Sequence, residues 1–215
     1  MNTNNMIDAI YCDFDGTITK NDSVNGFLEK FTGDKWLESE KLWIEGKISS
    51  RENAIIQVGL LKNISQNQLD DYIDSIEIDD YFLDFVDYVK SNNIKLTILS
   101  DGFDLFIQKV LERYDLDIPY YANKLIYKNG DFSIEFPYYN ENCNKKAGMC
   151  KCQKVKENLF CYIGDGTSDL CIATKADLLF ASKNLHEYCK KNNIKHSHFT
   201  SFRNIMDVLK EWDNV

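Results

Sequence analysis

Apolar residues recur at helical spacing over the first third of the chain. A short apolar run at 7–12 predicts a strand, and the residues that follow place four apolar side chains at i, i+3, i+4 and i+7: Val24, Phe27, Leu28 and Phe31. Ser49 and Ser65 are each followed three residues later by Glu or Gln, which is the capping-box pattern that opens a helix. Residues 20–78 are therefore predicted to form a small all-helical unit.

The remainder of the chain alternates between the two periodicities. Short apolar runs predict three buried strands, at 94–99, 159–163 and 177–181, and each is followed by a helical pattern. Asn129-Gly130 lies between two alternating aromatic runs, which predicts a hairpin. Strands that alternate with helices form a parallel sheet. We predict an α/β fold with a Rossmann-like parallel core, built from 1–19 and 79–215, and a helical-bundle cap inserted at 20–78.

Composition narrows the partners. The chain has 215 residues, with 25 Lys and Arg against 34 Asp and Glu, and a formal net charge of −9. A polyanion is repelled by such a surface, so nucleic acid is not an expected partner. No apolar segment is long enough to span a bilayer, and the Asn-rich start lacks the regions of a signal peptide. We expect a cytoplasmic protein with no membrane partner, whose oligomeric state the sequence leaves open.

Three polar motifs follow three of the predicted strands. They are Asp13-Phe14-Asp15-Gly16-Thr17, Ser100-Asp101-Gly102 and Gly164-Asp165-Gly166-Thr167-Ser168-Asp169. Open parallel sheets bind ligands at the carboxyl ends of their strands, so the three motifs are expected to meet there. Clustered carboxylates suit Mg²⁺. The hydroxyl of Ser100 and the backbone N–H groups after it, at the predicted start of a helix, form a natural cradle for phosphate.

In these motifs the chain resembles the haloacid dehalogenase superfamily of phosphatases. Residues 13–17 match the nucleophile loop of that superfamily, Ser100 its second motif and residues 164–169 its fourth. The resemblance implies that Asp13 attacks phosphorus to give an aspartyl-phosphate, while Asp15 serves as general acid and then as general base. It implies that Mg²⁺ is held by Asp13, the backbone carbonyl of Asp15 and Asp165.

The resemblance also assigns the phosphate-binding group. Ser100, Asp101 and Gly102, together with a lysine, are expected to steady the phosphoryl oxygens. Thr17 and Asp169 are expected to support the site, Asp169 by ordering either the metal's water shell or that lysine. Five lysines precede the fourth motif: Lys145, Lys146, Lys151, Lys154 and Lys156. Lys151 is preferred, since a helix starting there buries Val155 and Leu159 on one face, and Lys154 is the alternative.

Three cysteines surround the preferred lysine, at Cys143, Cys150 and Cys152. They could form a thiolate metal site with a fourth ligand from elsewhere, a redox-sensitive pair, or a loop of reduced thiols. Without an export signal, a disulfide scaffold is not expected.

The substrate is approached through the resemblance as well. The helical cap matches the phosphoserine-phosphatase-like branch, and residues 12–22, 100–106 and 177–182 are similar to phosphatases of 2-hydroxy-3-keto-5-methylthiopentenyl-1-phosphate in methionine salvage. The alternative substrate is phosphoserine, which the cap would read through Asp22 and Arg51. A protein that binds a phosphorylated ligand without turnover is an alternative of another class. Carboxylates at both Asp13 and Asp15 favour the enzyme, because binding alone does not require the second.

Overall fold

A single seven-stranded sheet organises the molecule. The computed structural model describes residues 7–143 and 146–212. The strand order is β4-β3-β2-β1-β5-β6-β7, and all neighbouring strands are parallel except β3 and β4. The strands are β1 (Ala9–Cys12), β2 (Lys95–Phe103), β3 (Tyr120–Lys128), β4 (Asp131–Glu135), β5 (Phe160–Gly164), β6 (Leu178–Ala181) and β7 (Ser197–His198). The predicted parallel α/β core is confirmed.

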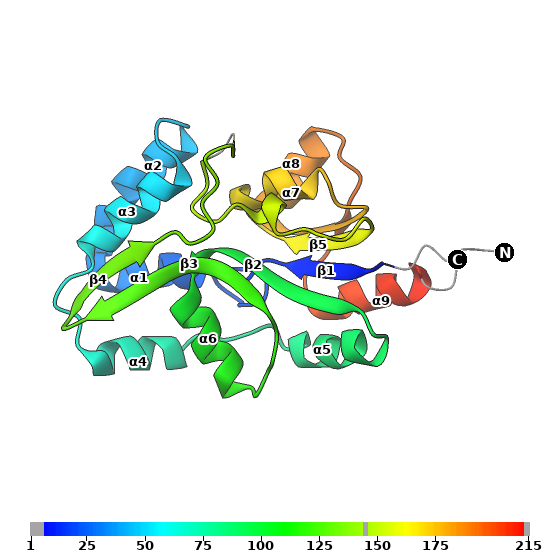
Figure 1. Ribbon diagram of the computed structural model, residues 1–215, viewed down its shortest axis with the longest axis horizontal. Coiled ribbons are helices and arrows are strands. Elements are labelled where there is room, and N and C mark those ends of the chain that lie inside the picture. The colour runs from blue at the N-terminus through cyan, green and yellow to red at the C-terminus, as the bar shows by residue number, and fades with distance from the viewer. Residues whose placement is uncertain (1–6, 144–145, 213–215) are drawn as a thin grey trace.

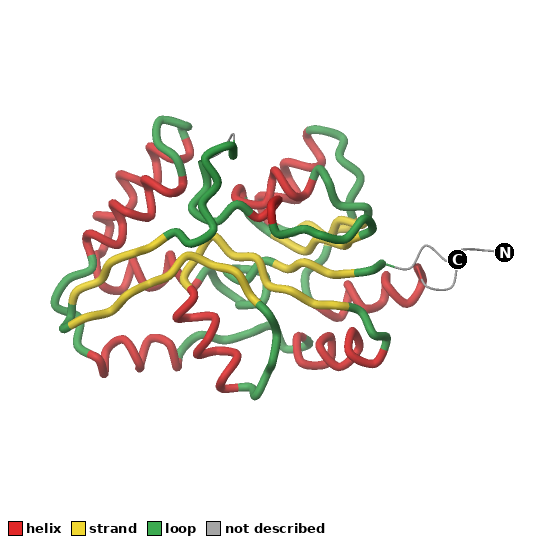
Figure 2. Tube along the Cα trace, viewed as in Figure 1, coloured by secondary structure: helices red, strands yellow, loops and turns green. Residues whose placement is uncertain are grey.

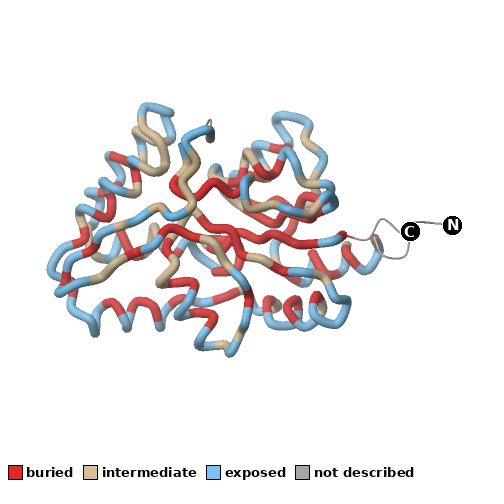
Figure 3. The backbone as a smooth tube through the Cα atoms, viewed as in Figure 1, coloured by how far each residue is buried: buried red, intermediate tan, exposed pale blue. Residues whose placement is uncertain are grey.

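Helices cover both faces of this sheet. In Figure 1, α5, α6 and α9 lie below the strands, and α7 and α8 lie above them. Those five helices are α5 (Phe82–Ser91), α6 (Asp104–Arg113), α7 (Leu170–Ala173), α8 (Lys183–Lys191) and α9 (Phe202–Trp212). The central strands are buried on both faces, as the continuous buried stretch of β1 in Figure 3 shows. None of the described helices is both long and apolar enough to cross a membrane.

Four further helices occupy the chain between β1 and α5. They are α1 (Ser23–Thr32), α2 (Leu37–Ile44), α3 (Ser50–Leu60) and α4 (Gln66–Asp74), with a 3₁₀ turn at Gly33–Trp36. The two ends of this insertion are held together. Thr19 and Ile78 form an antiparallel bridge, and the N–H of Lys20 donates to the carbonyl of Glu77 at 3.0 Å. The trace in Figure 2 shows α2 and α3 standing on the same side of the sheet as α7 and α8.

Local sequence signals explain where these inserted helices begin. Both predicted capping boxes are present, with the Ser49 and Ser65 hydroxyls accepting from the backbone three residues on. The insertion is not isolated from the sheet, since Phe27 of α1 packs edge-on against Phe106 and Phe132. Division into a core at 1–19 and 79–215 and a cap at 20–78 stays a prediction. Residues 1–6, 144–145 and 213–215 of that core lie outside the described residues.

The hairpin forms where the sequence indicated. Asn129 and Gly130 both have positive φ, at 53° and 90°, and join β3 to β4. Asparagine and glycine tolerate this left-handed backbone better than other residues, and it turns the chain in the sense that strand twist requires. The hairpin extends the sheet between α3 on one side and α4 on the other (Figure 1), and β4 packs against α3.

Three expectations about local structure were wrong or incomplete. The helix predicted to follow Lys151 is only a 3₁₀ turn at Lys151–Gln153, after which the chain runs irregularly to β5. Strand β2 continues through Phe103, so Ser100, Asp101 and Gly102 lie within the strand end and α6 starts at Asp104. Sequence reasoning also missed α9, although its buried residues stand at i, i+3, i+4 and i+7: Phe202, Ile205, Met206 and Leu209.

Candidate active site

A cavity of about 240 Å³ opens at the carboxyl ends of β1, β2 and β5. All three sequence motifs contribute to its wall, because parallel neighbours bring their strand ends to one edge. From the sheet come Asp13, Asp15, Ser100, Asp101, Gly102, Phe103, Asp165, Gly166, Thr167 and Ser168, joined by Lys183 and Asn184 of α8. The inserted helices and their connections close the other side with Asp22, Val24, Asn25, Glu40, Trp43, Ile44, Ser50, Asn53, Ala54 and Gln57.

Asp13 follows β1 directly and is buried. One carboxylate oxygen, Oδ1, accepts from the Phe14 N–H at 2.8 Å and lies 3.0 Å from the ammonium of Lys151. Both contacts are made to Oδ1, so among the described residues Oδ2 has no hydrogen-bond donor. Burial, and next the charge of Asp169, hold the pKa of Asp13 well above its ordinary value.

Asp15 stands two residues further on and faces the same cavity. Its carboxylate accepts from the hydroxyls of Ser100, at 2.9 Å, and of Ser23 at the start of α1. Burial raises the pKa of Asp15 to about 6, and the nearby charge of Asp22 adds to this, while the two hydroxyls act in the opposite direction. A carboxyl group with a pKa near 6 can both donate and accept a proton near neutral pH.

Lys151 is almost completely buried, with 1% of its side chain exposed. Its Nζ forms ion pairs with two acids, lying 3.0 Å from Asp13 Oδ1 and 2.5 Å from Asp169 Oδ1. Nζ also donates to the Tyr162 hydroxyl at 3.2 Å. Burial alone lowers the pKa of Lys151, but the charges of Asp13 and Asp169 outweigh it and raise the pKa above its ordinary value. This lysine is therefore a permanent cation beside Asp13.

Asp169 is the fully buried anchor of that lysine. Its Oδ1 accepts from Lys151 and Tyr162, and its Oδ2 accepts from the backbone N–H groups of Asp165 and Gly166, each at 3.0 Å. Gly164 makes the close approach possible, because a Cβ there would lie 2.4 Å from Asp169 Oδ2. Both oxygens are thus occupied by donors from the protein.

Asp165 and Thr17 meet across the strand ends. The Thr17 hydroxyl donates to Asp165 Oδ1 at 3.3 Å, and Lys183 lies 3.0 Å from Asp165 Oδ2. Lys183 also donates to the carbonyl of Gly16. Sequence reasoning missed this lysine, which is the first residue of α8 and has a positive φ of 41°. The only available signal was its place two residues after the strand that ends at Ala181.

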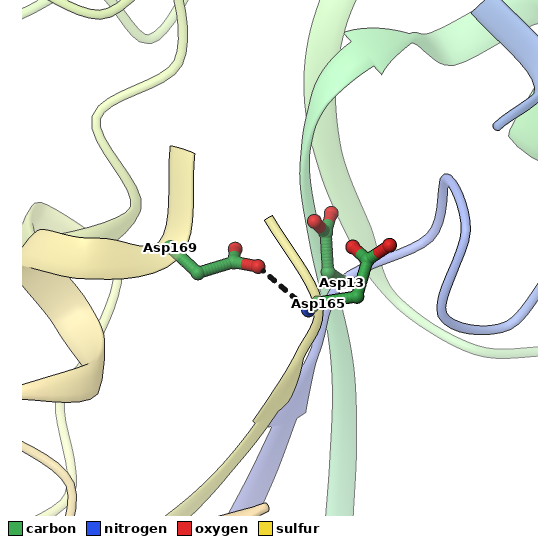
Figure 4. A group of neighbouring side chains, drawn as sticks. All are labelled: Asp13, Asp165 and Asp169. Atoms are coloured by element: carbon green, nitrogen blue, oxygen red, sulfur yellow. Dashed lines mark hydrogen bonds between the residues drawn. The ribbon is translucent and has the colours of Figure 1, made fainter. Parts of the chain in front are cut away.

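Three carboxylates are close enough to share one cation. One oxygen each of Asp13, Asp165 and Asp169 lies within 4.8 Å of the others, and within the described residues these three form the one such group of His, Cys, Asp and Glu. Figure 4 shows the carboxylates of Asp13 and Asp165 extending in the same direction, whereas Asp169 reaches from the side to the backbone nitrogen of Asp165. The oxygens suit Mg²⁺, and Asp13 and Asp165 are the two acids oriented to supply them.

The residues of the second motif, Ser100-Asp101-Gly102, also make hydrogen bonds that hold the surrounding structure in place. Gly102 N–H donates to the Ser100 hydroxyl at 2.8 Å, which orients that hydroxyl toward Asp15. The Asp101 side chain accepts from Met149 N–H at 2.8 Å and from Asn123 at 3.1 Å, and so holds the loop before Lys151. All three motif residues line the cavity, but the backbone N–H groups are at a strand end and not at a helix start as expected.

The two residues predicted to read phosphoserine have different locations. Asp22 lines the cavity and also caps α1 through Asn25. Arg51 is not part of the cavity wall. Its guanidinium lies over the rings of Phe136 and Tyr139, with centroid distances of 5.1 and 4.9 Å. The structure therefore brings Asp22, but not Arg51, to the site.

The cysteines and the other lysines lie around the site without entering it. Cys143 lies beside Cys150, and Cys152 beside Cys171, where hydrogen bonding between the thiols lowers the pKa of Cys152 to about 7. Among the residues that the structure describes, these sulfurs do not form a group close enough to hold one metal ion.

The other described lysines before the fourth motif do not reach the cavity. Lys154 lies over the rings of Tyr121 and Tyr138. Lys146 and Lys156 are exposed, and Lys145 is outside the described residues.

Comparisons with known proteins agree with this arrangement. Residues 10–174 match the family model of the haloacid dehalogenase-like hydrolases. A 2-hydroxy-3-keto-5-methylthiopentenyl-1-phosphate phosphatase of Bacillus cereus strain B4264 is 31% identical, over 94% of this chain and 95% of its own. The enzyme of that name from Bacillus velezensis is 30% identical, over 96% and 91%. In fold, the chain is similar to a phosphoserine phosphatase solved as a phospho-aspartyl intermediate analogue, with a TM-score of 0.72. The two sequences are 23% identical, and the match covers 94% of this chain and 98% of that one.

Proposed function

Because the chain belongs to the haloacid dehalogenase-like hydrolases, we propose that it hydrolyses a small phosphomonoester through a phosphoryl group carried on Asp13. The chain is a phosphoric monoester hydrolase of this family. One observation carries the proposed route. Asp13, in a cavity shared with Asp15, has one oxygen held by Lys151 and Phe14, while its other oxygen has no hydrogen-bond donor among the described residues.

In the first step Asp13 Oδ2 attacks phosphorus. Lys151 and the Phe14 N–H fix Oδ1, so the carboxylate is already oriented when the substrate arrives. As the bond from phosphorus to the leaving oxygen breaks, protonated Asp15 donates its proton to that oxygen. The products of this step are the dephosphorylated alcohol or enol and a phosphorylated Asp13.

In the second step a water molecule releases the phosphate. Asp15, now a carboxylate, removes a proton from the attacking water, and the bond between Asp13 and phosphorus breaks to give inorganic phosphate. Ser100 holds Asp15 in place for both transfers. Lys151 does not line the cavity, and its charge acts beside the nucleophile, 3.0 Å from Asp13 Oδ1. The site is then ready for another substrate.

Asp13 and Asp165, with the backbone carbonyl of Asp15, would hold Mg²⁺. When bound, the ion neutralises charge that would otherwise keep a carboxylate and a phosphate apart. Asp169 is not assigned as a ligand, because each of its oxygens already has two donors, Lys151 and Tyr162 at Oδ1 and two backbone N–H groups at Oδ2. Among the described residues, each oxygen of Asp165 meets a single donor.

The proposed substrate is 2-hydroxy-3-keto-5-methylthiopentenyl-1-phosphate, which the relatives' names give as theirs. The wall of the cavity supports it over phosphoserine. Trp43, Ile44, Val24 and Ala54 offer apolar surface for a methylthio end. Recognition of a phosphoserine carboxylate requires a cation from the cap, and Arg51 is stacked on Phe136 and Tyr139 instead.

Release of phosphate from p-nitrophenyl phosphate tests the chemistry. Turnover is expected with Mg²⁺ and not after treatment with EDTA, and Asp13→Asn should lower kcat at least about a thousandfold. No turnover under either condition would instead favour a protein that only binds phosphorylated ligands.

The substrate is tested separately, on one enzyme preparation. We expect kcat/KM for the enol phosphate to exceed that for phosphoserine by at least about tenfold. The reverse order would refute the methionine-salvage substrate and leave the phosphatase chemistry standing.

A further inference from the structure

The inserted helices contribute to the cavity wall a carboxylate that the proposed chemistry does not use. Glu40 of α2 lines the cavity, and its Oε2 accepts from two side-chain amides, Asn53 at 2.8 Å and Gln57 at 3.1 Å. Asn53 and Gln57 lie four residues apart on one face of α3, and each is only 5% exposed. Two buried amides therefore fix one carboxylate in a single orientation.

The amide of Asn53 leaves one hydrogen bond unmade in this arrangement. A carboxylate only accepts, so the NH₂ group of Asn53 must face Glu40, and its Oδ1 is then left with no partner among the described residues. An unsatisfied buried amide oxygen costs stability. A simple link between α2 and α3 does not require that cost, whereas fixing the direction of Glu40 does.

The charges around Glu40 are of one sign. Asp22 is the other ionisable group that the inserted segment contributes to the wall, and it is also an acid. Among the described residues of the wall, Lys183 is the one cation, and it is paired with Asp165 at the opposite end. A substrate that reaches toward α2 and α3 thus meets hydrogen-bond acceptors and negative charge.

We propose that Glu40, held by Asn53 and Gln57, determines specificity for phosphomonoesters with a hydroxyl group, and without a carboxylate, on the carbon skeleton. The inference rests on the proposed function. Oε1, the oxygen not bound by the amides, accepts the hydroxyl hydrogen bond. A substrate carboxylate in the same place faces Glu40 and Asp22, and the one cation among the described wall residues, Lys183, is already paired with Asp165. Like charges at close range reject a ligand strongly.

Glycerol 3-phosphate and 3-phosphoglycerate are a matched pair of probes, since they differ in a hydroxymethyl group against a carboxylate. The readout is the ratio of their kcat/KM values, in which any general loss of catalysis cancels. The wild-type enzyme should prefer glycerol 3-phosphate. Glu40→Gln keeps an oxygen for the two amides and removes the charge, and it should shift the ratio toward 3-phosphoglycerate by at least about tenfold.

Glu38→Gln is the control, because Glu38 is an exposed acid on the same helix outside the cavity wall. It should leave the ratio within about twofold of wild type, and Glu40→Met provides a second neutral variant if the glutamine variant does not fold. An equal shift in Glu38→Gln, a shift below about threefold in Glu40→Gln, or no wild-type preference would each overturn the inference. Failure of the wild type to hydrolyse p-nitrophenyl phosphate would refute the proposed function instead.

Discussion

Replacement of Lys151 by methionine tests the interior of the site most directly. Methionine has similar length, so the change removes the charge and leaves the packing volume nearly intact. Lys151 contacts Asp13 at 3.0 Å, Asp169 at 2.5 Å and Tyr162 at 3.2 Å, and is 1% exposed. The variant therefore leaves two buried carboxylates without their shared cation.

The expected loss of stability is large for one substitution. Removing one partner from a buried ion pair costs about 3–5 kcal/mol, because the remaining charge stays buried without compensation. For a protein of this size about 1 kcal/mol corresponds to roughly 2–4 °C in Tm, so Tm should fall by about 6–20 °C. Phosphatase activity should fall by about a hundredfold or more, since the buried cation that orients Asp13 is lost.

Lys154→Met is the matched control. Lys154 lies three residues away and its ammonium is 4.0 Å from the centroid of the Tyr138 ring, a contact worth about 0.5–1 kcal/mol at an exposed site. Thermal and urea unfolding of both variants, without added metal, compares the two lysines. A Lys151→Met protein as stable as Lys154→Met would refute the assignment of a buried charge network.

The pH dependence provides an independent check. Burial and the charge of Asp169 raise the pKa of Asp13, and loss of Lys151 raises it further. When a group has a higher pKa in the folded than in the unfolded state, its contribution to the stability of the protein is lost as pH rises through the folded-state pKa. The stability deficit of Lys151→Met should therefore shrink as the pH is lowered from about 8 to about 5. A deficit that is constant across this range would show that protonation of Asp13 does not carry the effect.

Three further predictions address the acids at the strand ends. Burial raises the pKa of Asp15 to about 6, and the acid form donates the proton, so kcat/KM should fall as pH rises through that value. Asp15→Asn should remove this decline from the pH profile. Gly102→Ala would place a Cβ 2.1 Å from Asp15 Oδ2. The Asp15 carboxylate would be displaced, so kcat should fall at least about tenfold. An unchanged kcat would contradict the close contact between position 102 and Asp15. Asp165→Asn should raise the Mg²⁺ concentration needed for half-maximal activity by at least about tenfold, measured by titrating Mg²⁺ after the metal has been removed with EDTA. An unchanged Mg²⁺ requirement would exclude Asp165 as a ligand.

Sequence reasoning succeeded where the signal is local. The capping boxes at Ser49 and Ser65, the Asn129-Gly130 hairpin and the alternation of strands and helices each depend on residues a few positions apart. The meeting of the three motifs was predictable too, since parallel strands bring their carboxyl ends to one edge whatever the connections contain. These features need only backbone geometry and periodicity.

The choice among lysines shows where local reasoning stops. Lys151 was preferred because a helix was expected to start there, and that helix does not form. What sets Lys151 apart is burial between Asp13 and Asp169, residues 138 positions before it and 18 after it, while Lys154 lies on tyrosine rings nearer the surface. No local pattern distinguishes the two.

Tertiary structure alone decided which charges are neighbours. Lys183 meets Asp165 across 18 residues, Arg51 stacks on Phe136 and Tyr139 away from the cavity, and the amides of α3 fix Glu40 of α2. An amphipathic pattern specifies which face of a helix is buried, but not which element covers it. The identities of the acids and the strand ends that carry them were therefore determined by the sequence itself, whereas their partners, protonation and openness to a substrate depend on contacts that exist only after the chain has packed.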